Sequence, residues 1–182
     1  MKCRLYGKEI SEELNKCNNL PVIINEIISN YSRHLTCEEF KEKVMGGEKE
    51  YINIVLDDWD LKEIEMPGCI FIGCSFVNTN LEEANLSNTD LSNTDLSNVK
   101  LFYTNLFNVN LSYSKLSNAN LSYANLSFAK LKETNLSNSD LFNANLEDAK
   151  LLKANLIGSN LSYADLSRVD LSNAKLSRVD LR

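Results

Sequence analysis

The stretch from Leu81 to Leu181 decides the fold, because every fifth residue in it is leucine without exception. The chain reads Ala84-Asn85-Leu86-Ser87-Asn88 and later Ala119-Asn120-Leu121-Ser122-Tyr123. A straight α-helix turns about 100° per residue, so leucines five apart would scatter around its circumference. In a straight β-strand, an odd spacing sends successive leucines to opposite faces. The period therefore predicts an extended chain that bends once per repeat and returns each leucine to the interior.

A second inward position precedes each leucine by two residues. From Thr79 to Ala129 this position holds only Thr, Ala, Val or Ser. Residues two apart on an extended segment face the same side, so the slim residue points inward beside the leucine. The other three positions carry mainly polar residues and are predicted to face water. The predicted core contains Leu81, Leu86, Leu91, Leu96, Leu101, Leu121, Leu141 and Leu161, with Ala84, Ala119 and Ala124 as small companions.

The recurring A(D/N)LXX motif resembles that of the pentapeptide-repeat proteins over roughly the last two-thirds of the chain. The resemblance implies an all-β solenoid, a right-handed quadrilateral parallel β-helix with about twenty residues per coil. Coils stacked about 4.8 Å apart would then give a rod roughly 30 Å long. Because each coil contacts mainly its neighbours, we expect its stability to be close to a sum of nearest-neighbour terms.

The first part of the chain has a different composition. Residues 1–50 are predicted to form a small α-helical N-terminal cap, and residues 51–182 the β-helix. Lys8–Cys17 is expected to be a short polar helix, and Leu20–Leu35 an amphipathic helix with apolar residues at 3–4 spacing. A helical cap would cover the first open edge of the stack, which would otherwise invite aggregation.

A third helix is predicted immediately before the repeats. Thr36-Cys37-Glu38-Glu39 matches a capping box, and the helix that it opens should bury Phe40 and Val44. Gly46-Gly47 is expected to end it. Trp59 lies in the first coil, at a position that is slim in later repeats, and is predicted to contact the cap.

Five cysteines, an odd number without framework spacing, favour a reducing cytoplasm. Cys69 and Cys74 are predicted to be small buried fillers rather than a disulfide. His34 and Cys37 lack a second Cys/His pair at metal-ligand spacing, so no metal site is expected. With a single histidine, no phosphate-binding glycine loop and no nucleophile beside a base, the chain is predicted to be neither an enzyme nor a cofactor-binding protein.

The formal net charge of −6 argues against direct binding of nucleic acid, because phosphates are bound by basic surfaces. Residues 1–6 lack a signal-peptide apolar core, and no apolar stretch is long enough to span a membrane. Asparagines recur immediately before the central residue of the repeat, as at Asn85 and Asn105, and two residues after the centre, as at Asn78 (after Phe76) and Asn98. We interpret these asparagines as structural ladders that hydrogen-bond along the rod.

Two outward groups are candidates for an interaction surface. Acidic residues crowd the first coils, and outward tyrosines follow further along. The acidic group indicates either a docking surface for a basic partner or simple solubility, and the second interpretation is favoured. The aromatic group is equally consistent with an interface and with sheet stability. The candidate residues are Asp57, Asp58, Asp60, Glu63, Glu82, Glu83, Tyr103, Tyr123 and Tyr163.

The sequence thus predicts a non-enzymatic scaffold that presents flat faces to an unidentified protein. The resemblance implies an alternative, a DNA mimic that binds a type II topoisomerase and modulates fluoroquinolone sensitivity. This sequence departs from that pattern in two ways. Its acidity is confined to the first coils, and its repeat runs unbroken from Leu56, without inserted loops. The repeat continues to Leu176 and Leu181, which predicts a homodimer formed through the C-terminal coils.

Overall fold

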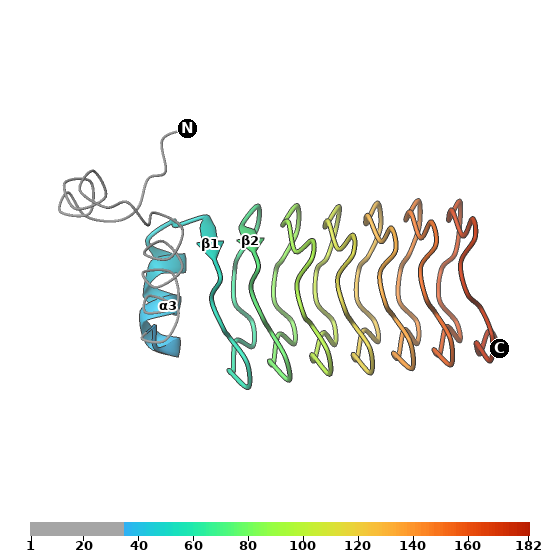
Figure 1. The fold of residues 1–182 in the computed structure, drawn as a ribbon, viewed down its shortest axis with the longest axis horizontal. Coiled ribbons are helices and arrows are strands. Elements are labelled where there is room, and N and C mark those ends of the chain that lie inside the picture. Colours follow the sequence, from blue (N-terminus) through green and yellow to red (C-terminus); the bar gives the residue numbers. More distant parts are fainter. Residues whose placement is uncertain (1–34) are drawn as a thin grey trace, which may run out of the picture.

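The computed structural model describes residues 35–182. The helix expected at Lys8–Cys17, most of the one expected at Leu20–Leu35, and His34 lie outside these residues. The described chain begins with helix α3 (Cys37–Met45), followed by strand β1 (Glu50–Ile52). Strand β2 (Ile70–Ile72) pairs with β1 in parallel, with Tyr51 opposite Phe71. A regular stack of coils then continues to the C-terminus (Figure 1).

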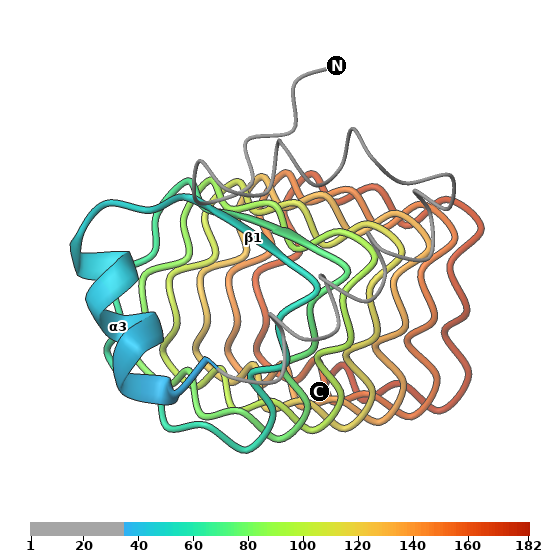
Figure 2. The ribbon, with the colours of Figure 1, turned by 60° about the vertical axis from the view of Figure 1, so that its left-hand side comes forward.

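Parallel bridges join residues twenty positions apart throughout the stack, from Val55–Ser75 to Asn160–Asp180. Four such columns of bridges run along the rod, one for each side of its four-sided cross-section (Figure 2). The coil length of twenty residues, which the resemblance implied, is therefore confirmed. The column from Val55 to Lys175 contains six coil spacings, or about 29 Å, close to the predicted length.

Each pentapeptide ends in a turn with the same backbone conformation. The Trp59 amide donates to the Leu56 carbonyl at 3.3 Å, and this bond recurs in later repeats. From Asn53 to Arg178, the residue two positions after the centre has a φ of 52–63° wherever it is not glycine. A positive φ at this turn position bends the extended chain, as in a type II turn. The bend required by the period of five thus occurs at one defined residue per repeat.

Backbone hydrogen bonds between coils connect the turns along the rod. The Leu81 amide donates to the Lys100 carbonyl of the following coil at 2.8 Å. The Asn80 amide donates to the Trp59 carbonyl of the preceding coil at 2.9 Å. Each coil therefore satisfies its backbone mainly through its two neighbours, as a solenoid of nearest-neighbour units requires.

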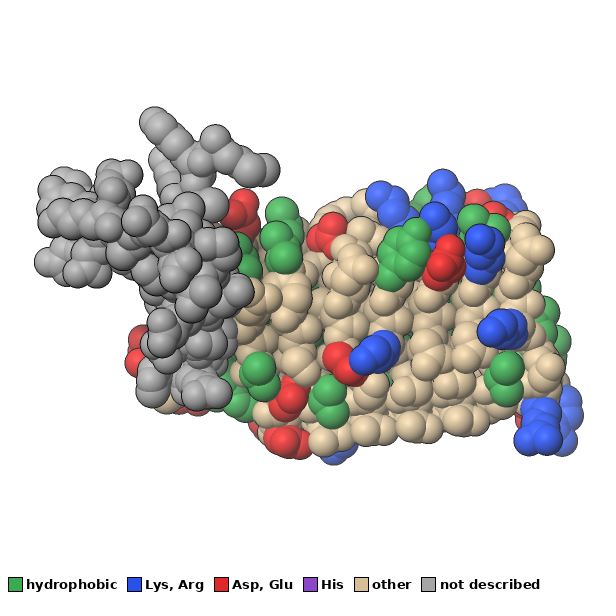
Figure 3. All heavy atoms as spheres, in the orientation of Figure 1, with side chains coloured by type: hydrophobic (Ala, Val, Ile, Leu, Met, Phe, Trp, Pro, Cys, Tyr) green, Lys and Arg blue, Asp and Glu red, His purple; other side chains and the backbone are tan. Residues whose placement is uncertain are grey.

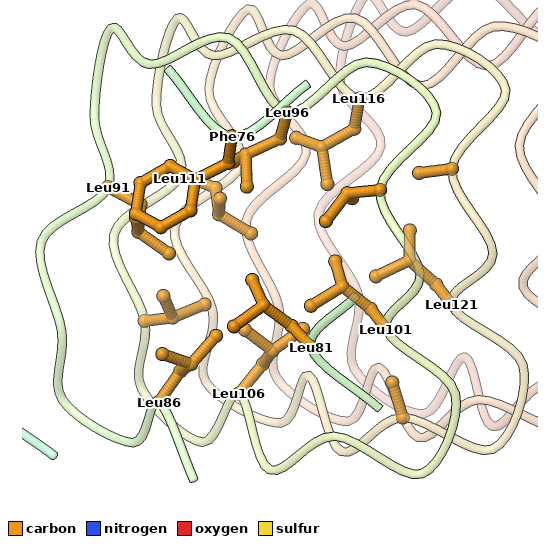
Figure 4. Packing of buried hydrophobic residues seen from close by; sticks show 14 of the residues in the cluster. Phe76, Leu81, Leu86, Leu91, Leu96, Leu101, Leu106, Leu111, Leu116 and Leu121 are labelled. Carbon is orange, nitrogen blue, oxygen red and sulfur yellow. The ribbon is translucent and has the colours of Figure 1, made fainter. Parts of the chain in front are cut away.

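The leucines project into the interior from all four sides (Figure 4). Inward threonine and serine hydroxyls bond to leucine carbonyls, as Thr79 Oγ1 does to the Leu56 oxygen at 2.7 Å. In residues 35–182, no buried side-chain nitrogen or oxygen lacks a hydrogen-bond partner. Polar residues at the slim position are therefore compatible with the core. The residues proposed as core are at most 3% exposed: Leu81, Leu86, Leu91, Leu96, Leu101, Leu121, Leu141, Leu161, Ala84, Ala119 and Ala124.

Helix α3 lies at the N-terminal end of the stack beside β1 (Figures 1 and 2). Thr36 and Glu39 form the predicted capping box, and Gly46 is the C-cap. The buried Phe40 ring lies 5.0 Å from that of Tyr51 and 5.8 Å from that of Trp59, between ring centroids. The third helix and the contact of Trp59 with it are thus confirmed.

The residue before each leucine does more than form an axial ladder. Asn85 Nδ2 donates to Glu65 Oε2 at 2.8 Å and its Oδ1 accepts from Asn105 Nδ2 at 3.3 Å, as a ladder would. The same Oδ1 also accepts the backbone N–H of Ser87 at 3.1 Å. This local bond recurs at most asparagines and aspartates of this position, for example from Ser122 to Asn120 at 3.1 Å. It is an Asx turn that holds the chain at the start of each corner.

The prediction that all three remaining positions face water is wrong for some serines directly after the leucine. Ser122, Ser127 and Ser162 are only 6–8% exposed. In the twenty-residue register, Ser122 lies between Phe102 and Phe142. A small side chain between two large rings of adjacent coils loses its access to solvent, so burial at this position depends on its neighbours along the rod.

Replacing an interior leucine should be much more costly than replacing one at the last coil. Leu121 is fully buried, whereas Leu176, at the same repeat position, is 44% exposed. We expect Leu121→Ala to lower the free energy of unfolding by about 2–5 kcal/mol because it leaves a cavity, and Leu176→Ala to lower it by clearly less. Urea unfolding followed by circular dichroism measures both, and equal losses would contradict the inward assignment.

Candidate interaction surface

One side of the rod brings together most of the residues proposed for binding. This side, here called the strip face, consists of the pentapeptides centred on Leu61, Leu81, Leu101, Leu121, Leu141 and Leu161. Its first two coils carry Asp60, Glu63, Glu82 and Glu83, here called the acidic cluster. Its later coils carry the aromatic strip, defined as Phe102, Tyr103, Tyr123, Phe142 and Tyr163.

The rings of the aromatic strip form one connected series. Tyr103 stacks on Tyr123 with 4.8 Å between centroids and 16° between planes. Phe102 meets both tyrosines edge to face, at 4.6 and 5.6 Å. Phe142 meets Tyr123 and Tyr163 in the same way, each at 5.6 Å. Tyr103 and Tyr163 remain 55% and 74% exposed, so the series is open to solvent at both ends.

Stability alone does not explain why tyrosine stands at these turn positions. Tyr103, Tyr123 and Tyr163 have φ values of 55°, 60° and 59°, at the position where asparagine is the commonest residue of the repeats. A left-handed conformation costs a residue with a bulky side chain about 1–2 kcal/mol, and asparagine tolerates it better. An aromatic pair contributes about 0.5–1.5 kcal/mol beyond its buried area. The cost of the left-handed conformation and the gain from the aromatic pairs nearly cancel, so a role in binding is a further reason for tyrosine at these positions.

The acidic cluster surrounds one lysine. Lys62 Nζ lies 2.9 Å from Glu83 Oε1 and 3.6 Å from Glu63 Oε1. The hydrogen bond that Lys62 donates to Glu83, together with the negative charges of Glu83 and the neighbouring glutamates, raises the pKa of Lys62 above its ordinary value. These groups are exposed, so the pairs contribute little to stability. They do show that this part of the face accommodates a cation.

Asp57 and Asp58 lie on the neighbouring side, in the pentapeptide centred on Leu56. Asp57 Oδ1 accepts from Ser75 Oγ at 2.6 Å and from the Val77 amide at 2.8 Å. Asp58 Oδ1 accepts from Asn78 Nδ2 at 2.9 Å. Both carboxylates therefore connect the first coil to the second, and the structure separates them from the acidic cluster.

Charge is distributed unevenly along the rod. Residues 50–99 include ten acidic residues and one basic residue, whereas residues 100–182 include seven acidic and ten basic ones. Acidic side chains gather over the first coils and basic ones over the later coils in Figure 3. On another side, Lys130 pairs in register with Lys150, and Lys132 Nζ lies 5.2 Å from the centre of the Tyr113 ring. The C-terminal part is thus mildly basic.

The described thiols are positioned for packing. Cys69 and Cys74 are buried and unpaired, and burial raises the pKa of the Cys74 thiol to about 11. Cys37 Sγ contacts the Asp60 carbonyl oxygen at 3.9 Å. Within residues 35–182, no group of three or more His, Cys, Asp or Glu side chains is placed to hold a metal ion.

A shallow hollow of about 200 Å³ lies beside β2, lined by Ile70, Phe71, Ile72, Gly73, Asp90, Ser92 and Asn93. Its only ionisable side chain is Asp90, which is used in an Asx turn with the Ser92 amide at 2.9 Å. At the other end of the rod, Leu176 and Leu181 are 44% and 62% exposed. No helix of the described chain is long and apolar enough to cross a membrane.

The residues of the strip face could be identified from the sequence, but their contacts with one another could not. Tyr103, Tyr123 and Tyr163 share a phase of twenty in the sequence, as do Phe102 and Phe142, but the contacts between the two sets were not predicted. The Asx turns were also missed, although the preference for Asn and Asp immediately before the leucine is their signal. The link between the rings requires the coil length, because it depends on which residues are adjacent across coils, whereas the Asx turn joins residues only two apart in sequence.

The repeat region matches two models of known protein families. A family model described as a pentapeptide repeat region matches residues 64–141, and one described as pentapeptide repeats matches residues 139–178 with eight copies. No curated protein sequence gives a significant match.

Solved structures similar to this chain include pentapeptide-repeat proteins and a resistance protein. HetL, a pentapeptide repeat protein involved in heterocyst differentiation regulation from the cyanobacterium Nostoc, is 22% identical, with 81% of this chain and 95% of that chain covered and a TM-score of 0.35. The Nostoc protein alr5209 is 25% identical, with coverages of 81% and 96% and a TM-score of 0.44. QnrB1, a plasmid-mediated fluoroquinolone resistance protein, is 22% identical, with coverages of 73% and 74% and a TM-score of 0.33.

The two family models together extend from residue 64 to residue 178, the region of regular coils. They match the same five-residue period that places each leucine inside the rod. The chain therefore belongs to the pentapeptide-repeat family, and its fold is the right-handed quadrilateral β-helix of that family.

Proposed function

We propose that this protein is a non-enzymatic scaffold of the cytoplasm that binds another protein through a flat side of its β-helix. The observation that carries the proposal is the aromatic strip, a connected series of rings on an outward face. Contiguous exposed apolar groups on a soluble rod are typical of interaction sites, and tyrosine is enriched at protein interfaces. The ionisable and sulfur-containing groups of the described chain support packing, turn capping and ion pairs rather than a catalytic arrangement.

Site-specific photocrosslinking tests this proposal. A photoreactive phenylalanine analogue in place of Tyr123 should crosslink a defined protein in cells, because this position lies in the middle of the strip. The same analogue in place of Phe128, at the same repeat position on another side, is the control. A captured protein counts only if, once purified, it binds the unmodified chain and loses affinity for Tyr123→Asn. Capture with equal efficiency at both positions would contradict the proposal.

A second candidate is a DNA mimic that binds a type II topoisomerase, and the acidic first coils favour it. Ten acidic residues against one basic residue between positions 50 and 99 give that part of the rod a strong negative field. The excess of basic residues after Lys100 opposes it, since a duplex mimic would be negative along its length.

Gyrase supercoiling reactions separate the two candidates. We expect a large molar excess of the purified protein neither to inhibit supercoiling nor to relieve inhibition by a fluoroquinolone. Either effect, lost in a Glu82→Gln/Glu83→Gln variant and retained in Glu133→Gln/Glu147→Gln, would replace the scaffold proposal with the DNA-mimic one.

The homodimer through the C-terminal coils is also a proposal, supported by the exposure of Leu176 and Leu181. Light scattering at micromolar concentration should then give twice the chain mass of 20.6 kDa. Leu176→Asp/Leu181→Asp should restore the monomer mass, because a charge cannot be buried unpaired in the interface. A monomer mass for the unchanged protein would disprove the dimer.

A further inference from the structure

We infer that the strip face binds a basic protein segment whose arginine side chains lie along the aromatic strip and the acidic cluster together. The inference rests on the proposed scaffold function and names the chemistry of its partner. It depends on the two groups sharing one side of the rod. The coils of Glu63 and Tyr163 are five spacings apart, so the combined surface is about 24 Å long.

The protein contains an example of each contact that such a segment would make. Lys132 lies over Tyr113, a tyrosine at the same turn position as those of the strip, with 5.2 Å between Nζ and the ring centre. Lys62 lies between Glu63 and Glu83 in the acidic cluster. These are a cation–π contact and a cation held by two carboxylates, both provided by this backbone geometry.

Within residues 35–182, the aromatic strip is not covered by a cation. None of the described lysines and arginines lies over one of its five rings. The acidic cluster has four carboxylates and one lysine: Lys62 pairs with Glu63 and Glu83, and Asp60 accepts hydrogen bonds from Asn80 Nδ2 and the Lys62 amide. The strip face therefore offers uncovered aromatic rings and excess negative charge, both of which attract a cationic partner.

Charge decides between partners that bind aromatic surfaces. Single-stranded nucleic acid also stacks on aromatic side chains, but it requires a positive groove for its phosphates. Here the aromatic strip continues into carboxylates, which repel phosphates and attract basic side chains. Arginine suits the face better than lysine, because its planar guanidinium both packs against aromatic rings and forms paired hydrogen bonds with carboxylates.

Fluorescence anisotropy with labelled peptides and the full-length protein tests the inference. The probes are an oligoarginine of about eight residues, an oligolysine of the same length and an oligothymidylate. We expect the arginine peptide to bind more tightly than the lysine peptide, and the oligothymidylate not to bind. Equal affinities for the two peptides, or binding of the oligothymidylate, would overturn the inference.

Matched variants locate the binding on the strip face. Tyr103→Asn/Tyr123→Asn/Tyr163→Asn should weaken arginine-peptide binding about tenfold, the ratio expected from two or three exposed cation–π contacts. Asparagine occupies this turn position in repeats such as that of Asn98, so the variant should fold, and its thermal melting verifies this. Tyr113→Asn/Phe128→Asn, on other sides of the rod, is the control and should leave binding unchanged.

The acidic contribution has a similar pair of variants. Glu82→Gln/Glu83→Gln should weaken binding and reduce its salt dependence, whereas Glu133→Gln/Glu147→Gln, with the same change in net charge elsewhere, should not. If the controls weaken binding as much as the strip-face variants, only diffuse attraction is present and the inference is wrong. Crosslinking from Tyr123 to a partner without a basic segment would overturn this inference while leaving the scaffold proposal intact.

Discussion

The left-handed residue two positions after each leucine is the constraint on which the rest of the rod depends. It recurs from Asn53 to Arg178 and turns the chain at every corner. Without this bend, leucines five apart would alternate between faces, and no continuous core could form. Inward packing of leucine, pairing of coils and burial of the slim residue all follow from a corner at this position. The cost of the conformation is lowest for glycine and asparagine, which explains their frequency there.

Much of this architecture could be predicted from residue spacing. The five-residue period excluded helix and straight strand, and the slim companion of each leucine indicated which residues point inward. The capping box at Thr36 located α3, because such local hydrogen bonds depend on neighbours in sequence. The coil length could not be obtained in this way. A period of five is compatible with several numbers of sides, and only the family resemblance specified four.

What the sequence did not reveal is mostly contact between coils. The burial of Ser122 and the link from Tyr123 to Phe142 both join residues from adjacent turns of the solenoid. The Asx turns escaped notice for another reason. A ladder of asparagines along the axis was a sufficient explanation for the composition, although the same oxygen also accepts a local N–H. The asparagine side chain thus serves two structural roles, one along the rod and one within its own turn.

The rod divides its residues between a uniform interior and a variable exterior. Interior positions repeat almost unchanged and hold nothing that would distinguish one partner from another. Outward positions differ from coil to coil, and the strip face is where aromatic and acidic residues depart furthest from the asparagine and serine background. Recognition can therefore change without altering the core, since outward side chains of neighbouring coils are independent of the leucine columns.

The number of repeats between two outward residues decides whether they lie on the same side of the rod. Leucine returns every five residues, but a given side of the rod returns only every twenty. Loss of one pentapeptide between Glu83 and Phe102 would keep every leucine inside, yet it would move all later outward residues onto the preceding side. The acidic cluster and the aromatic strip would then no longer share a face. Loss of a whole coil would shorten the rod and keep them aligned, so changes in length preserve a binding surface only in multiples of four repeats.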